Sequence, residues 1–261
     1  MAGYKETPRQ KMISMMYLVL TAMLALNVSV EILNAFTTVN ESVEQSNATL
    51  QSRIDETYNK FDQQYAINTS KVKENWTKAQ ELKQLSNELI GYINNMKYEV
   101  ISLSEGFSIE EAKTAKLHLL SSKDNYDVPT NYFINNMHAD SLQMRIENYK
   151  SDVKNILPEK VRDGFDLGLV TDGEYQNANG EMEDWKTHNF YHTVLAADVA
   201  LLNKLIMDVQ NTEYSIVNYL YSSLSEENFK FDKIDVKIIP KSNYVFVGEN
   251  YEADVLVVAY D

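Results

Sequence analysis

The feature that most constrains this chain of 261 residues is a stretch of 19 residues, Met12–Val30, that carries no charged side chain. As an α-helix, a stretch of that length spans about 28 Å, close to the hydrocarbon thickness of a bilayer. A buried core helix is the alternative, although 19 uncharged residues is long for one. A cleaved signal peptide does not fit, because Ala22 and Ala25 lack the small-x-small spacing of a cleavage site. We therefore predict a single transmembrane helix within residues 12–32.

Charged residues flank this stretch unevenly. Lys5, Arg9 and Lys11 precede it against one acidic residue, Glu6, whereas the chain as a whole has a formal net charge of −14. Basic segments are retained on the cytoplasmic side of a membrane. Residues 1–11 are thus expected in the cytoplasm, and the acidic remainder is expected to be exported.

The predicted membrane helix carries a stripe with steps of four, three and four residues: Leu18, Ala22, Ala25 and Ser29. Small residues four apart let helices approach closely, so this stripe is a candidate seam for a second copy or a partner, although small residues are common in membrane helices generally. The helix has no carboxylate of its own, so a proton-carrying carboxylate beside it has to come from another chain. Tyr17 is either an interfacial anchor or a member of a hydrogen-bond relay.

The apolar periodicity continues beyond the membrane segment as far as Tyr65, and the first seam positions are Leu33, Phe36, Asn40, Val43 and Asn47. A polar residue at such a position can set the register or the oligomeric state of packed helices. No Gly or Pro occurs between Pro8 and Gly91. We therefore predict one continuous helix over 12–65, a rod that transmits motion better than a flexible linker would.

Residues 33–226 have the pattern of an elongated bundle of amphipathic helices, so the predicted fold class is mainly α. Ser108 and Glu111 have the spacing of a capping box, and Pro158 is a helix stop. The expected elements are helices at 72–100, 109–122, 136–157 and 186–224, a loop at 123–133 and a surface excursion at 163–184.

The apolar period changes near the end of the chain from that of a helix to that of a strand. Apolar residues at every second position begin at Ile234, and two more apolar runs follow at 244–247 and 251–260. We predict about three strands within residues 227–261. A sheet this small is not a stable unit on its own, so we expect the β domain to continue beyond residue 261.

Composition argues against most kinds of chemistry. The chain has no cysteine, which excludes disulfides, Fe–S clusters, thiolate zinc sites and cysteine nucleophiles. Its negative charge would repel nucleic acid. No P-loop, dinucleotide motif or nucleophile–base set is present. We expect no cofactor and no enzymatic activity.

One histidine pair suggests a metal site at first sight. His188 and His192 are four residues apart and follow Glu183 and Asp184. The order of an HExxH motif is absent and no third ligand can be assigned, so a packed pair at a helix start is the preferred interpretation. The neighbouring aromatic residues are interpreted as core: Trp185, Phe190 and Tyr191.

Four short motifs follow one another near the N-terminus: PRQKM at 8–12, MMYLVLTA at 15–22, ALNVS at 25–29 and EIL at 31–33. Together they closely resemble the N-terminus of the GldM (PorM) family of the gliding-motility and type IX secretion machinery. The stretch Trp185–Val217 is similar to that family more loosely.

The resemblance implies a single-pass inner-membrane protein with a helical first periplasmic domain, followed by Ig-like domains that reach outer-membrane-side components. It also implies a homodimer inside a ring of the polytopic membrane protein GldL, driven by the proton-motive force. At matching positions, Arg9 would pair with an acidic group of GldL and Tyr17 would join its polar network. Two other functions stay open: a membrane sensor with a ligand-binding bundle, and a passive scaffold.

Overall fold

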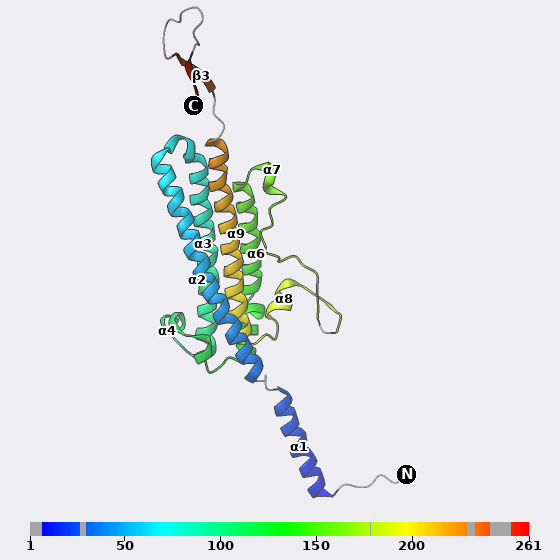
Figure 1. Ribbon diagram of the computed structural model, residues 1–261. Helices are drawn as coiled ribbons and strands as arrows, with labels where there is room; N and C mark the ends of the chain where they lie inside the picture. Colours follow the sequence, from blue (N-terminus) through cyan, green and yellow to red (C-terminus); the bar gives the residue numbers. More distant parts are fainter. Residues whose placement is uncertain (1–6, 27–29, 178, 229–232, 241–251, 261) are drawn as a thin grey trace, which may run out of the picture.

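The structure, a computed structural model, describes residues 7–26, 30–177, 179–228, 233–240 and 252–260. Four helices, α2, α3, α6 and α9, pack side by side as a bundle in which α3 runs opposite to the other three (Figure 1). In chain order the elements are α1 (Pro8–Leu26), α2 (Val30–Ile67), α3 (Thr69–Glu105), α4 (Ile109–Thr114), η1 (Leu117–Leu119), α5 (Asp127–Thr130), η2 (Asn131–Asn135), α6 (His138–Ile156), α7 (Glu159–Arg162), β1 (Tyr175–Gln176), β2 (Met182–Glu183), α8 (Trp185–Phe190), α9 (Leu195–Asn228), β3 (Lys233–Pro240) and β4 (Ala253–Tyr260).

The bundle has one continuous apolar core, since each long helix buries a stripe of side chains against its neighbours. Aromatic side chains pack within this core, where the Phe133 and Phe190 rings stack with centroids 4.3 Å apart. The largest fully buried side chains include Tyr58, Phe61, Phe133, Phe190, Ile54, Leu82, Ile93, Leu142, Ile146, Leu157, Leu195 and Leu202. The prediction of a mainly helical fold with strands at its C-terminal end is confirmed.

Capping residues set the ends of the α2–α3 hairpin. Asn68 alone separates the two helices, and its side chain accepts the N–H of Lys71 at 3.4 Å as the N-cap of α3. α3 ends at Gly106, whose φ of 73° is in the left-handed region that favours glycine and whose N–H reaches the Ser102 carbonyl at 2.9 Å. This tight connection makes α3 run back opposite to α2, and both helices pack against α9.

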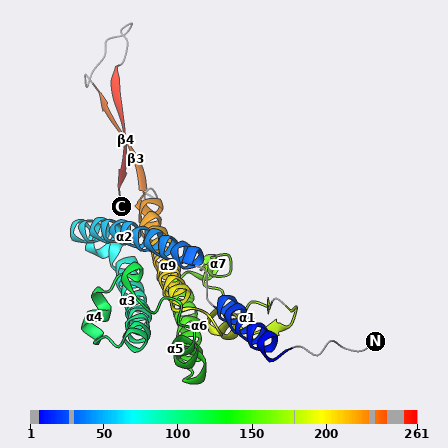
Figure 2. The same ribbon diagram turned by 90° about the horizontal axis from the view of Figure 1, so that it is seen from below.

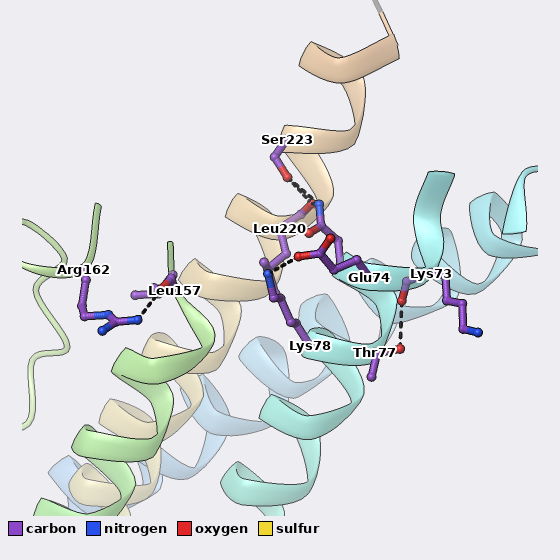
Figure 3. Close-up of polar contacts among 9 residues, drawn as sticks. Lys73, Glu74, Thr77, Lys78, Leu157, Arg162, Leu220 and Ser223 are labelled. Carbon is purple, nitrogen blue, oxygen red and sulfur yellow. Dashed lines mark hydrogen bonds and ion pairs between the residues drawn. The ribbon is translucent and has the colours of Figure 1, made fainter. Parts of the chain in front are cut away.

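The bundle end nearest the β3–β4 hairpin is closed by polar contacts between α3 and α9 (Figure 3). Asn75 of α3 donates to the Leu220 carbonyl at 3.3 Å and to Ser223 Oγ at 2.9 Å. Beside it, Lys78 and Glu74 form an exposed ion pair of 2.7 Å. These contacts fix the position of the last turns of α9, from which β3 follows.

The first helix, α1, stands apart from the bundle in both views (Figures 1 and 2). Its large apolar side chains from Met12 to Leu20 are 50–73% exposed. Among the helices that the structure describes, none is both long enough and apolar enough to cross a membrane. The transmembrane helix predicted over 12–32 is therefore not confirmed. The continuous helix predicted over 12–65 is not tested as a whole, because residues 27–29, between α1 and α2, lie outside the described residues.

One predicted helix is divided in the structure, because contacts with a distant segment compete there with the local periodicity. The helix expected over 186–224 is divided into α8 and α9 by a turn in which His192 has a φ of 53°. Backbone groups at this turn bond to the preceding loop instead: Leu195 N–H donates to the Asn125 carbonyl at 2.8 Å, and Ala196 N–H donates to the Lys123 carbonyl at 3.0 Å.

The segment 123–133, predicted as a loop, becomes helical from residue 127 onward. Pro129 occupies the first turn of α5, where its missing N–H is tolerated, and the Asn125 side chain accepts the Val128 N–H at 3.1 Å. Tyr132 and Phe133 are buried in η2. Residues that favour turns act here as helix-start residues.

The capping box at the start of α4 is confirmed by reciprocal bonds between Ser108 and Glu111. The helix ends at Thr114 rather than at residue 122. The chain then becomes extended at Ala115, which allows Leu117 and Leu120 to be buried.

The segment 163–184, predicted as a surface excursion, is attached to the bundle in its first half. Leu167 and Leu169 are buried, and Thr212 of α9 donates to the Leu167 carbonyl at 2.6 Å. Further on, β1 and β2 form a short antiparallel pair.

At the C-terminal end, β3 and β4 pair antiparallel from Lys233 opposite Tyr260 to Pro240 opposite Ala253. The strand predicted at 244–247 lies outside the described residues.

Candidate functional site

The first part of the candidate site is the start of α1. Thr7 N–H donates to Gln10 Oε1 at 3.0 Å and Gln10 N–H donates to Thr7 Oγ1 at 3.4 Å, the reciprocal pattern of a capping box, with Pro8 at the first helical position. Arg9 is thereby placed in the first turn, where the helix dipole disfavours a cation.

Tyr17 and Leu18 lie further along α1 and are 73% and 69% exposed. Eight residues separate Arg9 from Tyr17, a rise of about 12 Å along the helix, so the chain itself does not bring these two side chains together. Ala22 and Ala25 belong to α1, but their side chains and Ser29 lie outside the described part of the structure. The membrane seam predicted from these residues stays a prediction.

The second part of the candidate site is a polar seam between α2 and α9. Asn40, 1% exposed, accepts a 2.7 Å hydrogen bond from Asn203 Nδ2, and the same Nδ2 donates to Glu44 Oε1 at 3.1 Å. Asn47 donates to the backbone carbonyl of Asn203 at 3.0 Å. The seam positions predicted on α2 thus face α9 of the same chain. Of the other predicted positions, Leu33 and Phe36 are half-buried against the core and Val43 is half-buried.

A lysine from α3 completes this seam. Lys97 Nζ donates to Asn203 Oδ1 at 2.8 Å, so that Asn203 joins all three helices. Burial lowers the pKa of Lys97, while the charge of Glu44 opposes that shift. The seam therefore holds one acidic and one basic group that are connected through Asn203. Bonded amides of this kind fix one register between helices, because a shifted pairing would leave buried polar atoms unsatisfied.

A shallow groove of about 410 Å³ runs beside the polar seam on the outer face of α2 and α9. Its lining is mostly polar and includes Ser42, Ser46, Thr49, Arg53, Met207 and Asn211. The face of α2 opposite its buried stripe is thus accessible along several turns.

Sequence reasoning identified the α2 half of the seam but missed the α9 half. The signal is present, because Asn203, Gln210 and Glu213 continue the apolar stripe of α9 in steps of three and four from Val199 to Val217. All three are buried. Polar residues on an apolar stripe indicate buried hydrogen bonds, provided that the partner helix is known.

The predicted histidine pair is not brought together as a ligand pair. His188 lies on α8, stacks on Tyr175 and has Nδ1 3.5 Å from Glu183 Oε2, whereas His192 occupies the left-handed turn after α8. Within the described residues, no three His, Asp or Glu side chains are placed to hold a metal ion. Of the aromatic residues interpreted as core, Trp185 and Phe190 are buried but Tyr191 is exposed.

These features define a helical-bundle domain with an apolar N-terminal helix and a following β segment. Residues 31–223 match the GldM N-terminal domain, and residues 225–261 match the GldM second domain. The chain therefore belongs to the GldM family and is a component of the gliding-motility and type IX secretion machinery. No individually curated protein matches the sequence.

Proposed function

We propose that the chain is a membrane-anchored, periplasm-spanning subunit of a motor that couples proton flow across the inner membrane to type IX secretion and gliding. It acts as a homodimer held by a GldL-like partner and has no enzymatic activity of its own. The observation that carries the proposal is α1, a helix with an exposed apolar surface next to a self-contained bundle of the GldM family.

The surface of α1 supports anchoring, because exposed apolar side chains in such a continuous array require a cover of lipid or protein. In the sequence, the uncharged stretch extends beyond the end of α1 to Val30. The basic residues Arg9 and Lys11 at its start favour a cytoplasmic N-terminus. In this arrangement the bundle lies in the periplasm.

The proton path has to involve a partner, because the uncharged stretch supplies no carboxylate. In the proposed complex, Arg9 pairs with an acidic group of the GldL-like protein and Tyr17 hydrogen-bonds to its polar residues. Proton passage changes the orientation of the α1 pair relative to the surrounding ring. Later domains carry this motion to outer-membrane-side components.

Transmission through the periplasm depends on α2 moving together with the bundle. The bonds of Asn40 and Asn47 to Asn203 hold α2 against α9, from which the β segment follows. A rigid α2–α9 pair passes rotation or tilt onward, whereas a flexible linker would absorb it.

Two substitutions test the role of α1. Arg9→Ala and Tyr17→Phe should impair gliding and secretion while the complex still assembles. Lys11→Ala and the exposed bundle residue change Tyr191→Phe serve as matched controls that should leave both activities intact. Full gliding and secretion in both α1 variants would refute the assignment of these residues.

Native mass spectrometry of the chain purified from native membranes tests the complex itself. Two copies together with several copies of a small polytopic membrane protein support the motor. A dimer without such a partner would refute it and favour a ligand-binding sensor or a passive scaffold. A flexible Gly/Ser insertion near residue 35 should spare assembly but abolish motion, and a fully active insertion variant would argue against rigid transmission.

A further inference from the structure

Four helices of the bundle meet around the carboxyl group of Glu213, which is 2% exposed. Tyr58 of α2 lies with its hydroxyl oxygen 2.9 Å from Glu213 Oε1. Ser86 of α3 lies beside Glu213, and its hydroxyl oxygen is 3.0 Å from the hydroxyl of Tyr149, which belongs to α6. The polar chain from Tyr149 to Tyr58 thus crosses the bundle through Glu213, a residue of α9.

The hydroxyl group of Tyr58 has two acceptors for one hydrogen. Its oxygen lies 2.9 Å from Glu213 Oε1 and 3.1 Å from the Ala79 carbonyl oxygen of α3. With an ionised Glu213, one of these oxygen pairs has no hydrogen between its atoms. With a protonated Glu213, the carboxyl O–H donates to the Tyr58 oxygen and Tyr58 donates to Ala79, so both contacts become hydrogen bonds. The geometry fits the protonated acid.

Charges on two neighbouring helices act on this group in opposite directions. Asp55 of α2 raises the pKa of Glu213 and Lys83 of α3 lowers it. Ser86 and Tyr149 are neutral, and Gln210, one turn earlier on α9, is an amide. Burial is the largest effect and raises the pKa of Glu213 to about 7. Burial and the nearby Glu213 also raise the pKa of Tyr58 far above its usual range, so Tyr58 keeps its hydrogen.

We propose that Glu213 is a proton-binding site at the centre of the bundle and that its proton switches the hydrogen bonds joining α2, α3 and α9. With the proton bound, Glu213 donates to the Tyr58 oxygen and Tyr58 donates to the Ala79 carbonyl. When the proton leaves, the Tyr58 hydroxyl turns to the carboxylate, Ala79 loses this contact, and a negative charge is left among buried side chains. The packing of α2 against α3 is then weaker, so the bundle senses the pH of its compartment near neutrality.

Asp198 provides a contrast within the same helix. Its carboxyl group is buried as deeply, and burial raises its pKa well above the usual range, but neither of its oxygens has a hydrogen-bond partner. Its proton therefore rearranges no contact between helices. Asp198→Asn is for this reason the matched control for Glu213→Gln.

The test is an infrared titration of the full chain in detergent, which follows the carbonyl band of protonated carboxylic acids between about pH 5 and pH 9. We expect a component with a midpoint near 7 that Glu213→Gln removes and Asp198→Asn leaves in place. Absence of such a component from the wild-type chain, or its survival in Glu213→Gln, overturns the proposal.

Neighbour substitutions test the site without removing the acid. Lys83→Met should raise the midpoint, because it removes a positive charge that favours the ionised form, whereas Asp55→Asn should lower it. Opposite shifts for the two charge substitutions support the proposal even if Glu213→Gln does not fold. A midpoint that neither change moves contradicts it.

Discussion

Helices α1 and α9 are both rich in apolar residues, but those of α9 are mostly buried and those of α1 are not. α1 exposes its large apolar side chains and has its charges only in the first turn. α9 buries polar side chains that have partners on α2 within an apolar stripe: Asn203, Gln210 and Glu213. The comparison teaches that apolarity alone does not identify a core helix. A core helix of this bundle is recognised by polar residues with partners inside the chain, whereas the apolar side chains of α1 are left exposed by the rest of the chain.

The largest expected difference between the two regions concerns truncation of a large side chain. Phe133→Ala should lower the free energy of unfolding by about 3–5 kcal/mol, because the ring is fully buried against Phe190. Met16→Ala on α1 should change it by less than about 0.5 kcal/mol. Urea unfolding followed by circular dichroism measures both. Equal losses would show that α1 belongs to the bundle core.

The second prediction concerns pH. Because the pKa of Glu213 is raised from 4.5 to about 7, its contribution to stability is complete below the unfolded pKa and is lost as the pH rises through 7. The loss amounts to roughly 3 kcal/mol at about 1.4 kcal/mol per pKa unit. Glu213→Gln should flatten the dependence of the unfolding free energy on pH between about 4 and 8. An unchanged slope in this variant would contradict the prediction.

The third prediction concerns the polar seam. Asn203→Ala should cost about 2–3 kcal/mol, because it leaves Asn40 and Lys97 without their buried partner. The exposed Asn34→Ala on α2 is the control and should stay within about 0.5 kcal/mol. Chemical denaturation measures the free energy of unfolding of both variants. If Asn203→Ala leaves it unchanged, the polar seam does not fix the register between α2 and α9.

The smallest effect compares two capping boxes. Ser108→Ala should lower the unfolding free energy of the bundle by about 1 kcal/mol, since it removes the cap of α4. Thr7→Ala removes the corresponding bond in α1 and should leave the unfolding midpoint of the bundle unchanged, while amide exchange at the start of α1 becomes faster. An equal loss of unfolding free energy in both variants would mean that α1 unfolds together with the bundle.

Local signals in the sequence were sufficient for much of the fold. The long helices follow from their apolar period, the capping box from Ser108 and Glu111, and the end of α6 from Pro158. The break at His192 could not be predicted, because it is stabilised by hydrogen bonds from Leu195 and Ala196 to the distant loop residues 123–125. Periodicity carries no information about such contacts.

The candidate site was predictable only in part for a similar reason. Asn40 and Asn47 were recognised as seam residues, but their partner Asn203 is more than 150 residues away, and their pairing depends on which helices are neighbours. The carboxyl group of Glu213 likewise gains its properties from burial among other helices and from its neighbours Tyr58 and Ser86. The roles of Arg9 and Tyr17 depend on a partner and stay predictions.

The most direct test asks whether lipid covers α1 while water surrounds the bundle. It uses single cysteine variants, because these 261 residues contain no cysteine. Single variants Met16→Cys on α1 and Ser46→Cys on the exposed face of α2 are treated with a membrane-impermeant maleimide in cells with a permeabilised outer membrane. We expect complete labelling of Ser46→Cys and protection of Met16→Cys until detergent is added. Equal labelling of both positions without detergent would place α1 in water, against the proposed membrane anchor.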